Sequence, residues 1–178
     1  MFKRILEISR SYTEKELDWI YHIVRSIPSK GLALEVGLQE GISTAVIYLG
    51  LDAQSSFITI DTGAITVDKF DTFVTTVKNT TGRYPIPFAV ESLGFLFLRS
   101  SSRDASYLFK NNSIDFLYYG DTTCLDEDLE TWLPKIRPGG IVAGHNYHIM
   151  YPSVVLMTNK WFIRKELKIV DTLWSVRL

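Results

Sequence analysis

The sequence predicts an α/β fold with a doubly wound, mainly parallel sheet covered by helices on both faces. Short apolar runs that lack polar alternation, as buried parallel strands do, recur along the 178-residue chain. Between them lie segments whose apolar residues repeat at helical spacing. Strands that alternate with helices imply right-handed βαβ units, and the length suits one domain, so residues 1–178 are expected to form a single domain.

The elements of the first half follow from local signals. Thr13 with Glu16 has the capping-box pattern, so a helix is expected over 13–26, where Pro28 ends it. The buried run at 32–36 reads as the first strand and ends at Gly37. The next expected elements are a helix over 42–51, a strand over 56–61 and a helix over 66–80.

The second half repeats the alternation. Pro85 and Pro87 prevent any regular element in 83–94. Strands are expected over 95–99, 114–119 and 141–144, the last after a turn at 137–140. Helices are expected over 103–110, 125–136 and 152–163, and two final strands flank 171–172.

Composition excludes several classes of protein. Hydrophobic residues are 46% and charged residues 22% of the chain, which excludes a disordered protein. The 19 basic and 20 acidic residues leave a net charge of -1, so no general electrostatic binding to nucleic acid is expected. The single cysteine, Cys124, excludes an internal disulfide. No apolar run is long enough to span a membrane, and a cytoplasmic location is the default expectation.

Ligands of such folds bind where parallel strands end, so the strand ends are the candidate site. Gly37 and Gly41 follow the first strand, and they would allow the backbone to approach a ligand closely. Gln39 breaks the dinucleotide fingerprint, and Ile42 after Gly41 excludes a P-loop. The neighbouring Glu35 favours a positively charged ligand over a phosphate. The alternative is that both glycines are simply turn residues.

Asp61 ends the second strand. A carboxylate at this point, after a first strand with a glycine-containing loop, is suited to accept hydrogen bonds from both hydroxyls of a ribose. The alternatives for Asp61 are a helix N-cap or a solvated acid in a loop.

Several stretches resemble class I S-adenosylmethionine (SAM)-dependent methyltransferases, and more narrowly the small-molecule O-methyltransferases related to macrocin and sugar methyltransferases. Residues 34–37 with 41–44 are similar to the first motif of the class. The narrower resemblance lies in residues 113–116, 128–134, 137–148 and 151–155. It implies a seven-stranded sheet whose last strand is antiparallel, and SAM as the cofactor across the first three strands.

The resemblance also implies roles for particular residues. Asp61 would hold the ribose hydroxyls, and Ser101 or Ser102 would reach the adenine. The residues implied at the methionine and ribose end are Glu35, Gly37, Gly41 and Ser43.

The chain departs from this family after the fourth and fifth strands. Where the family usually has Asp-Gly-Asp-His, the chain has Tyr119-Gly120-Asp121-Thr122. Asp121 and Asn146 could supply two oxygen ligands to magnesium, which is a thin set, so dependence on a divalent metal is expected to be weak or absent. Asp121 and His145 are the best candidates for accepting the acceptor's proton. The alternative for His145 is a loop-orienting hydrogen bond to the backbone.

The first hypothesis for function is therefore transfer of a methyl group from SAM to a hydroxyl of a small molecule or sugar. A second is a SAM- or nucleoside-binding module without catalysis, because the family's histidine is absent after the fourth strand. A third is another reaction, such as hydroxylation, on the same fold. No lid insertion is evident, so a second copy of the chain in a homo-oligomer could supply acceptor-binding surface.

Overall fold

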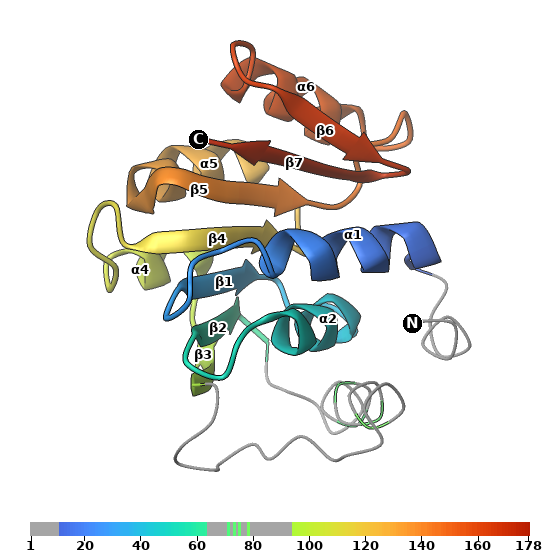
Figure 1. Ribbon diagram of the computed structural model, residues 1–178. Coiled ribbons are helices and arrows are strands. Elements are labelled where there is room, and N and C mark those ends of the chain that lie inside the picture. The colour runs from blue at the N-terminus through green and yellow to red at the C-terminus, as the bar shows by residue number, and fades with distance from the viewer. Residues whose placement is uncertain (1–10, 64–70, 72, 74, 76–77, 79–93) are drawn as a thin grey trace.

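The computed structural model describes residues 11–63, 71, 73, 75, 78 and 94–178, in which strands and helices alternate (Figure 1). The strands are β1 (Leu32–Val36), β2 (Ser56–Asp61), β3 (Gly94–Arg99), β4 (Ile114–Tyr119), β5 (Ile136–Gly144), β6 (Leu167–Val170) and β7 (Leu173–Arg177). The helices are α1 (Glu14–Val24), α2 (Ile42–Gly50), α4 (Ser102–Ser106), α5 (Leu125–Trp132) and α6 (Pro152–Trp161). Apart from four helical positions, the helix expected over 66–80 lies outside the described residues, as does 83–93.

Within the described residues, seven strands form one sheet in the order β3-β2-β1-β4-β5-β7-β6. The strands from β3 to β5 pair in parallel, whereas β7 runs antiparallel to both of its neighbours. The expected doubly wound, mainly parallel sheet with an antiparallel last strand is thereby confirmed. The strand order reverses between β1 and β4, which makes the carboxyl ends of these two strands the topological switch point.

Two apolar layers cover the two faces of the sheet. Along β1, Ala33 packs on one side with α1 and α2, whereas Leu34 packs on the other with α5. Figure 1 shows α1 and α2 in front of the strands and α5 behind them. Both faces of β1 are buried, which explains why its sequence lacks polar alternation. Among the described residues, no helix is both long enough and apolar enough to cross a membrane.

Three boundaries differ from expectation by more than two positions. α4 ends at Ser106, and α5 gives way at Leu133–Lys135 to a 3-10 turn that contains Pro134. The turn expected at 137–140 instead belongs to β5, where the pairing with β4 shifts register. The φ of Gly139 is 81°, so an irregular strand uses the glycine that sequence reasoning assigned to a turn.

The loops after β1 and β4 touch at the switch point through two glycines. Gly37 has a φ of 88°, and a Cβ built on it would lie 2.5 Å from the backbone nitrogen of Asp121. A Cβ on Gly120 would lie 2.3 Å from the carbonyl oxygen of Gly37. The backbone nitrogen of Gly120 donates to the oxygen of Val36 at 2.9 Å. This Gly37–Gly120 contact therefore requires glycine on both sides.

Replacing Gly37 with alanine should destabilise the protein more than replacing Gly139. Both glycines have positive φ, but nothing lies within 4 Å of a Cβ on Gly139. The free energy of unfolding of Gly139→Ala should therefore fall by only about 1–2 kcal/mol, because of backbone strain. That of Gly37→Ala should fall by roughly 1–3 kcal/mol more, because the added methyl group overpacks the contact. Urea denaturation measures both variants, and equal losses would contradict the close approach.

Candidate functional site

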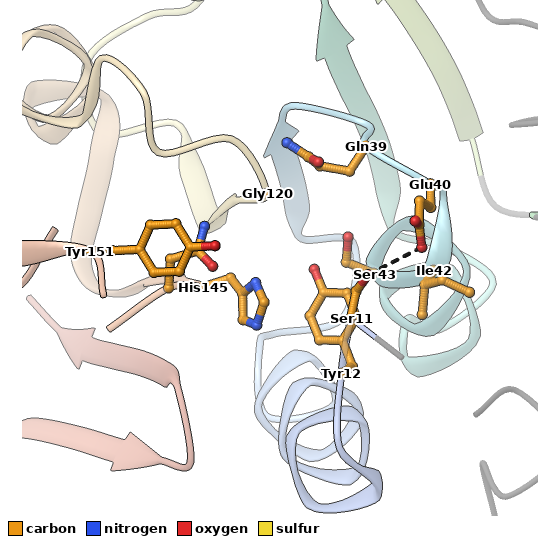
Figure 2. Close-up of a pocket in the computed structure, with 10 residues that line it drawn as sticks. Ser11, Tyr12, Gln39, Glu40, Ile42, Ser43, Gly120, His145 and Tyr151 are labelled. Atoms are coloured by element: carbon orange, nitrogen blue, oxygen red, sulfur yellow. Dashed lines mark hydrogen bonds between the residues drawn. The ribbon is translucent and has the colours of Figure 1, made fainter. Parts of the chain in front are cut away.

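Two cavities lie beside the Gly37–Gly120 contact. The first, of about 400 Å³, is named the Asp61 cavity, and its lining includes Gly37, Asp61, Ser101, Ser102, Asp121 and Asp128. The second, of about 270 Å³, is named the His145 cavity, and its lining includes Tyr12, Glu40, Ser43, Gly120, His145 and Tyr151 (Figure 2). Gly37 lines one cavity and Gly120 the other, so the cavities adjoin where these two loops meet. The volume of the Asp61 cavity falls within the range of roughly 300–1,000 Å³ that is usual for small-molecule sites.

Backbone amides fix the carboxylate of Asp61 at the end of β2. Its Oδ2 accepts a hydrogen bond from the nitrogen of Leu38 at 2.9 Å, and its Oδ1 accepts one from the nitrogen of Gly63 at 2.7 Å. A carboxylate oxygen can accept more than one hydrogen bond. Because Asp61 also lines the cavity, both oxygens are oriented in advance for a further donor.

The Asp61 cavity is acidic. Asp61, Asp121, Glu127 and Asp128 line it, whereas Arg103 is the one basic residue among its described lining residues. Burial raises the pKa of Asp128, and a hydrogen bond from Ser102 opposes that rise. This charge balance favours a ligand that carries positive charge.

Ser101 and Ser102 enter the same cavity from the start of α4. Ser101 caps the helix, since its hydroxyl accepts a hydrogen bond from the nitrogen of Asp104 at 3.1 Å. Ser102 accepts a hydrogen bond from the indole Nε1 of Trp132 at 2.8 Å, which ties its orientation to α5.

Glu35, which the family resemblance placed at the methionine and ribose end of the cofactor, is not among the residues that line either cavity. It is fully buried beneath the loop after β1, where its oxygens accept hydrogen bonds from Ser43 at 2.6 Å, Thr44 at 2.6 Å and Thr59 at 2.9 Å. Burial raises the pKa of Glu35 to about 7, and the three hydroxyls act in the opposite direction. Glu35 thus ties β1 to α2 and β2, and it supports the loop from below.

The remaining residues predicted near the cofactor are divided between several positions. Gly37 lies in the Asp61 cavity, but Ser43 lines the His145 cavity. Gly41 precedes α2 with a φ of 79°, and its nitrogen donates to the oxygen of Leu38 at 2.8 Å. Gly41 therefore shapes the loop and is not among the lining residues of either cavity.

Asp121 and His145 line different cavities, although sequence reasoning placed them together. The nitrogen of Asp121 donates to the oxygen of Val36 at 3.1 Å, which draws the loop toward β1 and the Asp61 cavity. The nitrogen of His145 donates to the oxygen of Tyr119 at 3.2 Å, and its side chain turns toward α1.

The imidazole of His145 is mostly buried and has aromatic and acidic neighbours. It stacks on Tyr12 with ring centroids 4.6 Å apart, and its Nε2 lies 3.9 Å from Oε1 of Glu16. Burial lowers the pKa of His145, and the charge of Glu16 acts in the opposite direction. A lowered pKa keeps the imidazole neutral at neutral pH, as a proton acceptor must be.

One oxygen of Asp121 and the amide nitrogen of Asn146, on the two side chains suggested for magnesium, make hydrogen bonds within the protein. Oδ1 of Asp121 accepts hydrogen bonds from the nitrogen and hydroxyl of Thr123, and the amide nitrogen of Asn146 donates to the hydroxyl of Thr122 at 3.4 Å. In the described part of the chain, no group of three or more His, Cys, Asp or Glu residues could hold a metal ion. Weak or absent metal dependence stays a prediction.

Sequence reasoning did not identify Tyr12, Glu127 or Asp128 as lining residues. Glu127 and Asp128 belong to an acidic first turn of α5, a pattern that attraction to the helix dipole alone explains. Tyr12 directly precedes the capping box of α1, and no local signal connects it to the strand ends.

Replacing Glu35 with glutamine should change how stability depends on pH. The pKa of Glu35 is raised from 4.5 to about 7, so the folded protein favours the protonated form. The stability from this group is complete below pH 4.5, and up to about 3 kcal/mol is lost as pH rises through 7. Glu35→Gln should lack this loss when urea denaturation at pH 5 and pH 8 is compared.

The matched control for this experiment is Glu130→Gln, because Glu130 is exposed on α5. It should keep the wild-type loss of unfolding free energy between pH 5 and pH 8. Parallel pH dependence in Glu35→Gln and the wild type would show that the buried carboxyl does not titrate in this range.

Comparisons with known proteins agree with this architecture. Residues 34–147 match the family model described as "Methyltransferase domain". No curated protein matches the chain. A solved structure of a protein from Corynebacterium glutamicum is similar to it, with a TM-score of 0.71 and 13% identity over 98% of this chain and 87% of that one.

Two further solved structures are similar. An O-methyltransferase from Bacillus cereus in complex with SAH has a TM-score of 0.68 and 15% identity over 99% of this chain and 90% of that one. A TDP-rhamnose 3'-O-methyltransferase of calicheamicin biosynthesis has a TM-score of 0.65 and 14% identity over 91% of this chain and 76% of that one. At these identities the structures show a shared fold. Because the family match covers more than half of the sequence, from within β1 to the loop after β5, the chain belongs to the methyltransferase domain family, with the class I fold that its sequence predicts.

Proposed function

We propose that the protein binds SAM in the Asp61 cavity and transfers its methyl group to a hydroxyl of a small molecule or sugar in the His145 cavity. The observation that carries the proposal is that two cavities adjoin at the switch point, one with a fixed carboxylate and the other with a buried imidazole. In this reaction the acceptor oxygen attacks the methyl carbon, the carbon–sulfur bond breaks, and S-adenosylhomocysteine (SAH) leaves.

The residues of the Asp61 cavity fit SAM in chemistry. Both oxygens of Asp61 are fixed by amides and could accept hydrogen bonds from the two ribose hydroxyls. Gly37 lacks a side chain that would separate the backbone from the ligand. The acidic lining suits the sulfonium and ammonium charges of SAM, and Ser102, which lines the cavity from the start of α4, could reach the adenine.

The residues of the His145 cavity suit a hydroxyl acceptor. A hydroxyl is a weak nucleophile at neutral pH, and a positioned base contributes roughly 10²–10⁴-fold. His145 would take the proton, since its buried imidazole is held neutral. The similar structures from Bacillus cereus and from calicheamicin biosynthesis are both O-methyltransferases, which supports a hydroxyl acceptor by analogy of fold.

Asp121 takes a different role in this proposal from the one that the sequence suggested. It lies with Asp61 in the cofactor cavity, so its charge would act on the sulfonium or ammonium group of SAM. Proton acceptance is then left to His145.

Replacing Asp61 with asparagine should weaken SAH binding by at least 10-fold. A charge-assisted hydrogen bond contributes roughly 1.5–3 kcal/mol, and the variant keeps only one acceptor oxygen. Isothermal titration calorimetry measures the affinity. Asp52→Asn is a control variant because Asp52 is exposed and lies in the loop before β2.

A control with a second ligand distinguishes the loss of ribose binding from a disturbance of the loop after β1. Asp61 also holds the loop after β1 through Leu38, so Asp61→Asn could weaken binding indirectly. A 2',3'-dideoxy analogue of SAH should bind the wild type and the variant about equally. An equal loss for SAH and for the analogue would mean that Asp61 does not hold the ribose.

Replacing His145 with alanine should lower turnover by roughly 10²–10⁴-fold while SAH affinity stays nearly unchanged. Asp121→Asn should instead lower the affinity for SAH while turnover stays nearly unchanged, since it removes charge from the cofactor cavity. The wild-type rate should fall as pH drops, with an inflection below 6.5, the ordinary pKa of histidine, because burial lowers the pKa of His145.

Turnover is followed as SAH release in a screen of hydroxylated acceptors. Reduced SAH affinity in His145→Ala, together with an unchanged rate, would contradict the assignment of the two cavities.

A further inference from the structure

The segment that precedes α1 forms one wall of the His145 cavity. Ser11 and Tyr12 both line it, and the hydroxyl of Ser11 donates to Oε2 of Glu40 at 3.2 Å (Figure 2). Glu40 belongs to the loop after β1, so this hydrogen bond joins the segment to that loop. Figure 2 shows Tyr12 between that loop and His145.

Tyr12 is held at its ring face and at its hydroxyl. The ring stacks on the imidazole of His145 with an interplanar angle of 26°, and the hydroxyl lies 3.2 Å from that of Tyr118 on β4. Only 9% of Tyr12 is exposed. A ring held in this way presents a fixed flat surface to the imidazole, and it limits the orientations that His145 can adopt.

Glu16 fixes the other side of the same arrangement. Its Oε1 accepts hydrogen bonds from the nitrogen of Thr172 at 2.8 Å and from its hydroxyl at 2.7 Å, and it lies 3.9 Å from Nε2 of His145. Its Oε2 accepts a hydrogen bond from the nitrogen of Thr13 at 2.8 Å. The capping box of α1 therefore fixes both the segment that carries Tyr12 and the carboxylate beside the imidazole.

We propose that Tyr12 is a positioning residue for methyl transfer, which fixes the imidazole of His145 in the orientation that faces the acceptor. The inference rests on the proposed function, because it assumes that His145 receives the acceptor's proton. It assigns a task to a residue outside the strand ends, where the sequence pattern places the other site residues. Misplacement of a reacting group by about 1 Å can lower a rate by about 100-fold, so an ordered imidazole matters for catalysis.

The test compares Tyr12→Leu, which removes the aromatic face, with Tyr12→Phe, which keeps it. The chain has three histidines, so His22 and His148 are internal references in NMR spectra of imidazole-labelled protein saturated with SAH. In the wild type and in Tyr12→Phe, the His145 ring should be rigid, with an order parameter near 0.85. In Tyr12→Leu it should fall below about 0.6. Tyr107→Leu is the control, because the Tyr107 ring is exposed just after α4, and it should leave the His145 ring rigid.

Turnover provides the second readout, with catechol and methyl rhamnoside as the acceptor probes. Tyr12→Leu should lower kcat by about 10- to 100-fold while KM for SAM changes little, and Tyr12→Phe should stay near the wild type. If neither probe is methylated, the NMR comparison decides alone. Tyr12→Met, which keeps bulk without an aromatic face, replaces Tyr12→Leu if the leucine variant does not fold.

An imidazole that stays equally ordered in Tyr12→Leu overturns the proposal, as does an unchanged kcat. Disorder already present in Tyr12→Phe would also overturn it, because the hydroxyl and not the stacked face would then hold His145. Failure of the proposed function has a different signature, since SAH would then produce no shifts in the amides of the Asp61 cavity.

Discussion

The candidate site depends on the close approach of two backbones at Gly37 and Gly120. No side chain separates the loops after β1 and β4, so both loops can turn away from each other immediately beyond the contact. One cavity forms on the β2 side and the other on the α1 side. An in-line transfer needs the acceptor oxygen roughly 3–3.5 Å from the methyl carbon, so the donor would have to reach past this contact to meet the acceptor.

The buried carboxyl of Glu35 supports this contact from below. Three hydroxyls from α2 and β2 converge on it, so the first turn of α2 and the neighbouring strand are tied to the end of β1. Asp61 completes the support by accepting a hydrogen bond from the nitrogen of Leu38. A buried acid with satisfied hydrogen bonds specifies one loop conformation, whereas an apolar residue at the same position would only fill space. The loop geometry and the proposed ligand binding thus share one carboxylate, that of Asp61.

Local signals in the sequence predicted the elements well. β4 occurs at 114–119 as expected, because a strand buried on both faces is mostly apolar, here with Asp115 as the exception. The capping box of α1 forms as its residues indicate. The β5 boundary was wrong because a Pro-Gly-Gly stretch is compatible with both a turn and an irregular strand. The family and its fold could also be predicted from the sequence, since the motifs that resemble the family lie at the ends of strands.

The division of the site residues could not be predicted in the same way. Whether Asp121 turns toward Asp61 or toward His145 depends on hydrogen bonds between loops, and these leave no local pattern. Glu35 looked like a ligand contact because its position in the motif is known, whereas its direction depends on hydroxyls up to 24 positions away. Tyr12 meets Tyr118 across a separation of 106 positions, and only the packing of α1 brings them together.

A crystal structure of the protein with SAH tests the central claim most directly, because it locates both ends of the cofactor at once. The account predicts that the ribose hydroxyls lie on Asp61, and that the sulfur points past the Gly37–Gly120 contact toward the cavity that holds His145. SAH bound elsewhere, or with its sulfur directed away from His145, would contradict the account.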